Sequence, residues 1–126
     1  MVAVSNMKNE VVKILIENGK ALGEIQREFS LHYPFLRIEF FKTVESNGMI
    51  RREKLKDEHR LMIKNLLAIN IGGDCTINDV KKDFLEKANL IIQIYRKSGN
   101  VWVETSHTNH WPLEQQNFEG EQMNLP

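Results

Sequence analysis

The chain has 126 residues, of which 41% are hydrophobic and 27% are charged, and its formal net charge is zero. A neutral chain of this length predicts one domain with a hydrophobic core, and it disfavours a protein that mainly neutralises nucleic-acid phosphates or an anionic membrane. Cys75 is the single cysteine, which excludes an intramolecular disulfide. No apolar run has the length of a signal peptide or a membrane span, so we expect a soluble cytoplasmic protein with no membrane partner.

We expect one domain over residues 1–126, built from four consecutive segments. They are a first βαβ unit (8–42), a charged connection (43–62), a second βαβ unit with a hairpin (63–106) and an acidic C-terminal segment (107–126). All 17 lysines and arginines lie within the first 97 residues, whereas the last 29 residues contain four glutamates and no basic residue. The acidic segment could therefore fold back onto the basic body or bind a basic partner.

The two βαβ units resemble each other. Residues 21–41 align with residues 76–96, and in both segments apolar residues recur at steps of three and four before a strand-like apolar run. That period predicts one amphipathic helix over about 21–32 and another over about 76–87. Thr76 and Asp79 have the spacing of a capping box at the start of the second helix. The pattern therefore indicates two α/β repeats.

Strands complete both units. "VVKILIE" (11–17) precedes the first helix, and "LLAINI" (66–71) precedes the second. The resulting order, βαββαβ, is that of a ferredoxin-like α+β fold, with both helices on one face of the sheet and the first and third strands at its centre. An additional C-terminal strand is expected over 101–106. The expected core residues are Ile25, Phe29, Ile38, Phe40, Val80, Phe84, Ile92 and Ile94.

The charged connection 43–62 is long for a hairpin and contains "RREKLKDEHR". We favour a solvated charged loop or a short surface helix for this segment. The alternative is a basic patch that binds nucleic acid, but Glu53, Asp57 and Glu58 would repel phosphate groups.

The stretch "RKSGNVWVETSHTNHW" (96–111) contains both tryptophans and is expected to form most of a hairpin and its exit. A two-residue turn at Ser98-Gly99 would place Tyr95 opposite Trp102, on the sheet face that points away from the helices. Exposed aromatic groups usually lie under another segment or mark a contact site, so we expect residues 107–120 or a second copy of the chain to cover this face. The expected interaction surface consists of Arg37, Phe41, Tyr95, Arg96, Lys97, Trp102, Glu104 and Trp111.

No stretch encodes a recognisable catalytic or cofactor site. His107 and His110 form a His-x-x-His pattern, but their segment is expected to be a loop, so the spacing fixes no metal geometry. Cys75 lies at the expected start of a helix, whose dipole can lower a thiol pKa, but no base can be assigned and Asp74 opposes the thiolate. We predict no bound metal and no cofactor.

Four stretches carry a family resemblance, namely "LGEIQREF", "YPFLRIEFF", "YRKSGNVWVET" and "WPLEQQN". Together they resemble a family of small uncharacterised bacterial proteins of the Bacteroidetes type. The resemblance covers about Val12 to Asn117. It implies no activity, because that family is of unknown function, but it implies that the C-terminal hairpin and "LEQQN" belong to the fold.

The sequence favours a non-enzymatic module that acts by protein–protein contact, as a homodimer or with another protein. One alternative is an enzyme or small-molecule binder with a pocket between the sheet and the C-terminal segment. A second alternative is a weak nucleic-acid binder, which the zero net charge disfavours. The pocket would be lined by Trp102, Glu104, His107, His110 and Trp111, and the nucleic-acid contacts would be made by Arg37, Lys42, Arg96 and Lys97.

Overall fold

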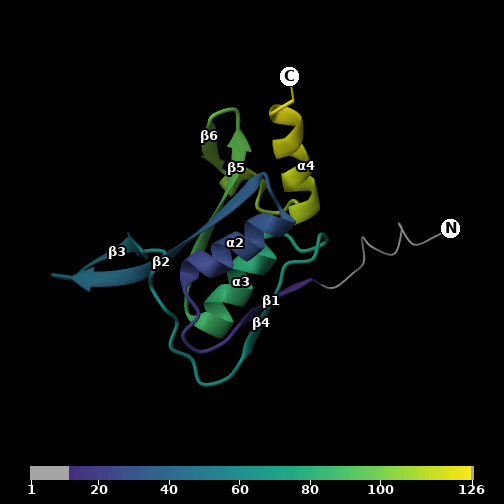
Figure 1. Ribbon diagram of the computed structural model, residues 1–126. Coiled ribbons are helices and arrows are strands. Elements are labelled where there is room, and N and C mark those ends of the chain that lie inside the picture. Colours follow the sequence, from purple (N-terminus) through teal and green to yellow (C-terminus); the bar gives the residue numbers. More distant parts are fainter. Residues whose placement is uncertain (1–11, 126) are drawn as a thin grey trace.

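The computed structural model describes residues 12–125, so Val11 and the start of the first predicted unit lie outside the described residues. Figure 1 shows its helices and strands. In chain order they are β1 (Lys13–Ile16), α2 (Leu22–His32), β2 (Leu36–Ser46), β3 (Met49–Lys54), β4 (Leu67–Asn70), α3 (Ile77–Ala88), β5 (Ile91–Ser98), β6 (Val101–Glu104), the 3-10 turn η1 (Ser106–Thr108) and α4 (Leu113–Met123).

The fold is a mixed α+β fold with two antiparallel sheets, but the ferredoxin-like arrangement predicted from the element order is wrong. One sheet has the strand order β3-β2-β5-β6, and the other consists of β1 and β4 alone. The first and third predicted strands are therefore not the centre of a common sheet. They pair with each other, with Lys13 opposite Asn70 and Ile16 opposite Leu67. Alternating apolar residues define the buried face of a strand, but they do not define its neighbour.

Helices α2 and α3 pack on one face of the four-stranded sheet, here called the inner face. This face carries Leu36, Ile38 and Phe40 from β2 and Ile92 and Ile94 from β5. The Phe40 and Phe84 rings meet edge to face, with their centroids 5.4 Å apart. The eight predicted core residues are each at most 1% exposed, which confirms that prediction. Ile14 of β1 and Ile69 of β4 join the same cluster, so the two sheets share one core.

The two helices begin in different ways. Thr76 and Asp79 form the predicted capping box of α3. Helix α2 has Ala21 at its N-cap and no capping side chain, and its first amides donate instead to backbone carbonyls of the charged connection. The N–H of Leu22 donates to His59 and that of Gly23 to Asp57, both at 2.9 Å. The connection therefore replaces the missing cap of α2.

The predicted loop or surface helix over 43–62 is wrong for residues 43–54, which belong to a β-hairpin, whereas residues 55–62 form a loop. Strand β2 continues to Ser46, and β3 returns alongside it from Met49. Asn47 and Gly48 join them with φ values of 53° and 77°. Two successive positive φ values make a type I′ turn, for which Asn-Gly is the preferred pair. Figure 1 shows this hairpin extending to the side of the molecule opposite α4.

The acidic C-terminal segment forms helix α4, which packs on the inner face and not on the opposite face as predicted. Leu113, Gln116 and Gly120 are its buried residues. The Gln116 side chain accepts a hydrogen bond from Arg96 at 3.0 Å, and a Cβ on Gly120 would lie 2.8 Å from that of Phe35. This buried stripe contains one apolar side chain, so it lacks the apolar period that identifies a packed helix in a sequence.

Candidate interaction surface

The face of the four-stranded sheet opposite the helices is here called the outer face. Alternate residues along each strand point to it, because successive side chains of a strand lie on opposite faces. Its strands are fixed by the pairs Arg37↔Tyr95, Glu39↔Gln93 and Tyr95↔Glu104. The outer face consists of Arg37, Glu39, Phe41, Gln93, Tyr95, Lys97, Trp102 and Glu104.

The predicted turn of the last hairpin is displaced by one residue, so Tyr95 pairs with Glu104, two residues beyond its predicted partner. Gly99 and Asn100 form the turn, with Gly99 at φ 63°, so Lys97 and not Tyr95 lies opposite Trp102. A positive φ at the first turn position alone, since Asn100 is not in the positive-φ region, is the type II′ geometry, which glycine favours. Because both strands shift together, every side chain keeps its predicted face. Trp102 therefore remains on the outer face, diagonal to Tyr95.

Glu39 lies at the centre of the polar contacts on the outer face. Its carboxylate is 3.1 Å from the Lys54 ammonium and 3.4 Å from the Arg37 guanidinium, and its side chain is only 15% exposed. Burial raises the pKa of the Tyr95 hydroxyl, and the neighbouring Glu39 and Glu104 carboxylates raise it further. Tyr95 therefore stays neutral at physiological pH. The aromatic rings of this face thus lie among charges of both signs.

The structure divides the predicted interaction surface between the two faces of the sheet. Arg37, Phe41, Tyr95, Lys97, Trp102 and Glu104 lie on the outer face. Arg96 points to the inner face, where its guanidinium lies 5.6 Å from the centroid of the Trp111 ring. Arg96 and Trp111 therefore help to hold α4 in place. Strand alternation alone would have separated Arg96 from its neighbours Tyr95 and Lys97.

The predicted pocket between the sheet and the C-terminal segment does not bring its residues together. Trp102 is on the outer face, whereas Trp111 lies on the inner side beside Arg96. His107 and His110 are exposed, in η1 and in the turn after it. Within residues 12–125, no three His, Cys, Asp or Glu side chains form a group that could hold a metal ion.

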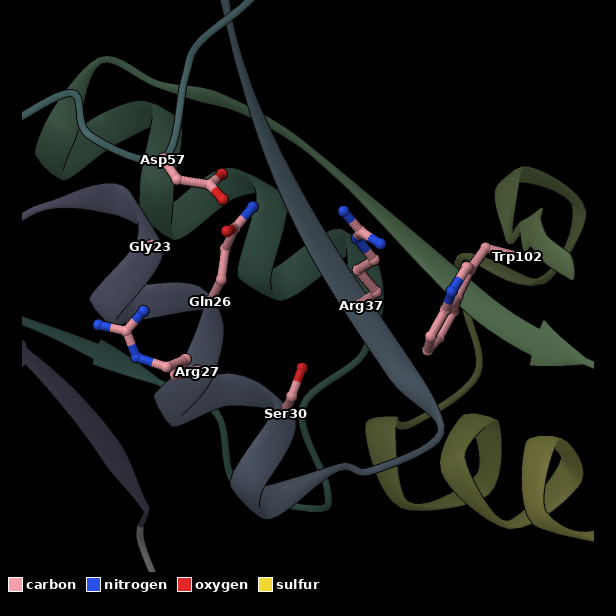
Figure 2. A pocket seen from close by; sticks show the side chains of 7 residues that line it. All are labelled: Gly23, Gln26, Arg27, Ser30, Arg37, Asp57 and Trp102. Carbon is pink, nitrogen blue, oxygen red and sulfur yellow. The ribbon is translucent and has the colours of Figure 1, made fainter. Parts of the chain in front are cut away.

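Trp102 instead borders an open depression at the edge of β2, with a volume of about 310 Å³. Gln26, Arg27 and Ser30 of α2 line it, and Figure 2 shows Arg37 of β2 and Trp102 on its other side, with the Arg27 side chain pointing away from them. Two of its polar groups already serve the fold, because Gln26 and Ser30 donate to backbone carbonyls of β2. The depression therefore extends the outer face around the strand edge towards α2.

Cys75 is not activated by its position near the start of α3. Burial raises the pKa of its thiol, and the Asp79 carboxylate raises it further. Its backbone carbonyl accepts a hydrogen bond from the Leu113 N–H of α4 at 2.7 Å. The backbone at Cys75 therefore binds the first turn of α4.

The sequence prediction missed the side chains of β3. Ile50, Arg52 and Lys54 continue the outer face beyond β2, because Thr43 pairs with Arg52 and Phe41 with Lys54. The available signal was the Asn47-Gly48 pair between two strand-like runs, which is a strong hairpin pattern. The outer face is therefore wider than the predicted surface.

No protein-family model matches the chain, and no curated protein or solved structure is significantly similar to it. Within the described part of the chain, no helix combines the length and apolar character needed to cross a membrane.

Proposed function

We propose that this protein is a protein–protein interaction module whose outer face binds a second copy of the chain. The observation that carries the proposal is the difference between the two faces of the four-stranded sheet. Helices α2, α3 and α4 pack on the inner face, whereas Arg37, Trp102 and Glu104 are exposed on the outer face and Gln93 is the buried member of its eight residues. Phe41 and Tyr95 remain half-buried there, and Trp102 is 38% exposed.

The aromatic character of this face favours a protein partner. Exposed aromatic groups with a charged border are typical of contact sites, since tyrosine and tryptophan bury a large area with few rotatable bonds. Trp102 lies beside Lys97 across the hairpin and diagonal to Tyr95. The rings could thus form the centre of an interface, with Arg37 and Glu104 at its border.

The charges of the outer face favour a second copy over nucleic acid. Arg37, Lys54 and Lys97 are countered by Glu39 and Glu104, and two of these cations already contact Glu39. A face with both signs can be complementary to itself about a twofold axis. A surface for phosphates would present an excess of free cations, and the proposed nucleic-acid contact Arg96 lies on the inner side.

Support for a non-enzymatic role comes from the groups that could have been reactive. The thiol of Cys75 has a raised pKa, and the polar groups Gln26 and Ser30 of the depression are engaged by β2. We also propose a cytoplasmic location, because an unpaired cysteine fits a reducing compartment.

Sedimentation velocity over a range of concentrations tests the proposal. The wild-type chain should show a reversible dimer, and Trp102→Glu should be monomeric, because it places a charge at the centre of the interface. Phe118→Glu is the matched control, since Phe118 is 52% exposed on α4. A wild-type chain that stays monomeric at all concentrations contradicts the proposal, as does a dimer that Trp102→Glu leaves unchanged.

A further inference from the structure

Strand β3 is the outermost strand of the four-stranded sheet, and all six of its residues are exposed. In a two-residue hairpin the pair of residues that closes the turn is hydrogen bonded, and here that pair is Ser46 and Met49. Every second residue of β3 from Met49 onward therefore bonds to β2 through its backbone. The N–H of Leu55, which donates to Phe40 at 2.9 Å, continues this alternation. The peptide groups of the other residues of β3 therefore point outwards. These residues are Ile50, Arg52 and Lys54.

Side chains close the other long edges of the two sheets. At residues 36–40 of β2, Gln26 donates to the carbonyl of Ile38 at 3.0 Å and Ser30 to that of Leu36 at 3.2 Å. Among residues 12–125, no side chain bonds in this way to the outward peptide groups of β3. Strand β6 is also an edge, but it has only four residues. In the other closing bonds, the side chains of Lys20, Lys87 and Thr105 donate to the carbonyls of Leu15, Ala68 and Ile94, and the Asp83 carboxylate accepts from the Asn70 N–H.

The charges of β3 decide which kind of strand can pair with this edge. When β3 pairs antiparallel with the β3 of a second copy, the outward-pointing residues of one strand lie opposite those of the other. Each such register is therefore symmetric about one residue, which lies opposite itself in the second copy. A register centred on Arg51 or on Arg52 places that arginine opposite itself. A register centred on Glu53 pairs the two glutamates and places Arg52 opposite Lys54. A register centred on Ile50 opposes no like charges, but it overlaps only residues 49–51 of each β3. Like charges directly opposite are destabilising, so the longer registers with a second copy are disfavoured.

We propose that the free edge of β3 binds an extended acidic segment of another protein, which adds to the sheet as a further strand. Backbone groups of Ile50, Arg52 and Lys54 would supply the hydrogen bonds, as in other cases of strand addition. Carboxylates of the added strand would face Arg52 and Lys54, and Arg52 would supply most of the charge match, because Lys54 already contacts Glu39 at 3.1 Å. Ile50, which is 70% exposed, would take an apolar side chain. The proposal extends the interaction role of the protein to a second surface and does not rest on the dimer.

A charged edge also has a purely protective role, because charges on edge strands prevent sheets from joining. The two roles differ in outcome. Protection alone predicts that no strand adds to β3, whereas the proposed site predicts that acidic strands add and basic strands do not. The sign of the charge on the added strand therefore separates them.

The experiment titrates the ¹⁵N-labelled full chain with two synthetic peptides. One alternates threonine and glutamate over ten residues, and the control replaces each glutamate with lysine. The acidic peptide should shift the amide signals of β3 and slow hydrogen exchange at Ile50, Arg52 and Lys54. Several charge pairs of a few tenths of a kcal/mol to about 1 kcal/mol each should make it bind at least about tenfold more tightly than the basic peptide. Equal binding, or none, overturns the proposal.

Three substitutions of Arg52 locate the binding. Arg52→Pro removes an outward N–H and leaves the bonds to β2 intact, so it should abolish binding. Arg52→Ala keeps that N–H and should weaken binding only several-fold. Arg52→Glu keeps the outward N–H and reverses the charge, so it should bind the basic peptide more tightly than the acidic one. This variant still tests the proposal if the proline variant fails to fold. Unchanged binding to a folded proline variant overturns the proposal. A wild-type dimer that Arg52→Pro abolishes and Trp102→Glu does not would reassign the edge to a second copy.

Discussion

The side-chain amide of Gln26 donates a hydrogen bond of 3.0 Å to the carbonyl oxygen of Ile38, and this contact joins helix α2 to the edge of strand β2. Strand β3 pairs with β2 only from Phe41 onward, so the carbonyls of Leu36 and Ile38, which point to this edge, would have no partner in the sheet. Buried carbonyls without a partner are costly, and a bare strand edge invites pairing with other chains. The polar side of α2 therefore completes the edge that β3 leaves open.

Gln26→Ala tests this contact. It should lower the free energy of unfolding by about 1–2 kcal/mol, because the Ile38 carbonyl lies in a buried residue and loses its donor. Arg27→Ala is the matched control, since Arg27 is exposed on the same helix and should change stability by less than about 0.5 kcal/mol. Urea unfolding of both variants gives the comparison. Equal losses would mean that helix propensity, and not the edge contact, sets the effect.

Phe84→Ala should destabilise the protein by about 3–5 kcal/mol, because it removes a fully buried ring that meets Phe40 edge to face. Phe118→Ala should cost less than about 0.5 kcal/mol, since Phe118 is half exposed on α4. Thermal unfolding of the two variants measures the difference. If Phe118→Ala were the more damaging change, the position of α4 on the inner face would be wrong.

Gly120→Ala tests the docking of α4 through the sign of its effect. Alanine is the better helix former, and an exposed helix position would gain up to about 1 kcal/mol from the change. Here the added Cβ would lie 2.8 Å from the Phe35 Cβ and 3.1 Å from the Arg96 Cγ. We therefore expect a loss of about 1–3 kcal/mol in unfolding free energy. An increase in stability would show that α4 does not approach the sheet this closely.

Tyr33→Phe should change the alkaline unfolding of the protein. The Tyr33 hydroxyl donates to the Ile71 carbonyl at 2.6 Å, and burial raises its pKa far above the ordinary value. An unfolded tyrosine ionises near pH 10, so the folded state binds the extra proton above that pH and stability falls as pH rises. The variant should lose about 1 kcal/mol at neutral pH and show a smaller decline above about pH 10. A decline as steep as that of the wild-type chain would contradict this account.

The sequence was sufficient to predict the helices and the core. The 21–32 and 76–87 predictions agree with α2 and α3, because apolar residues at helical spacing must face a common core. It could not predict that β1 and β4 form a sheet of their own, since strand alternation does not specify a neighbour. The duplication of the two units stays a prediction, as does the resemblance to small bacterial proteins.

Helix α4 and the C-terminal surface were harder to predict for a different reason. The buried contacts of α4 use the amide of Gln116 and the bare backbone of Gly120, which carry no hydrophobic signal. The outer face was recognised through Tyr95 and Trp102, because a shift of one residue on both strands leaves each side chain on its face. The β3 edge was missed although Asn47-Gly48 is a recognised hairpin turn.

The measurement that tests the central claim most directly is photo-crosslinking of the purified chain with Trp102 replaced by the photoreactive residue p-benzoylphenylalanine. If the outer faces of two copies meet, illumination should produce a covalent dimer whose crosslink joins position 102 to outer-face residues such as Tyr95 or Lys97 of the second copy. The same replacement at Phe118, on α4, should give little dimer. A crosslink yield at position 102 no greater than at position 118, or crosslinks only within one chain, would contradict the account.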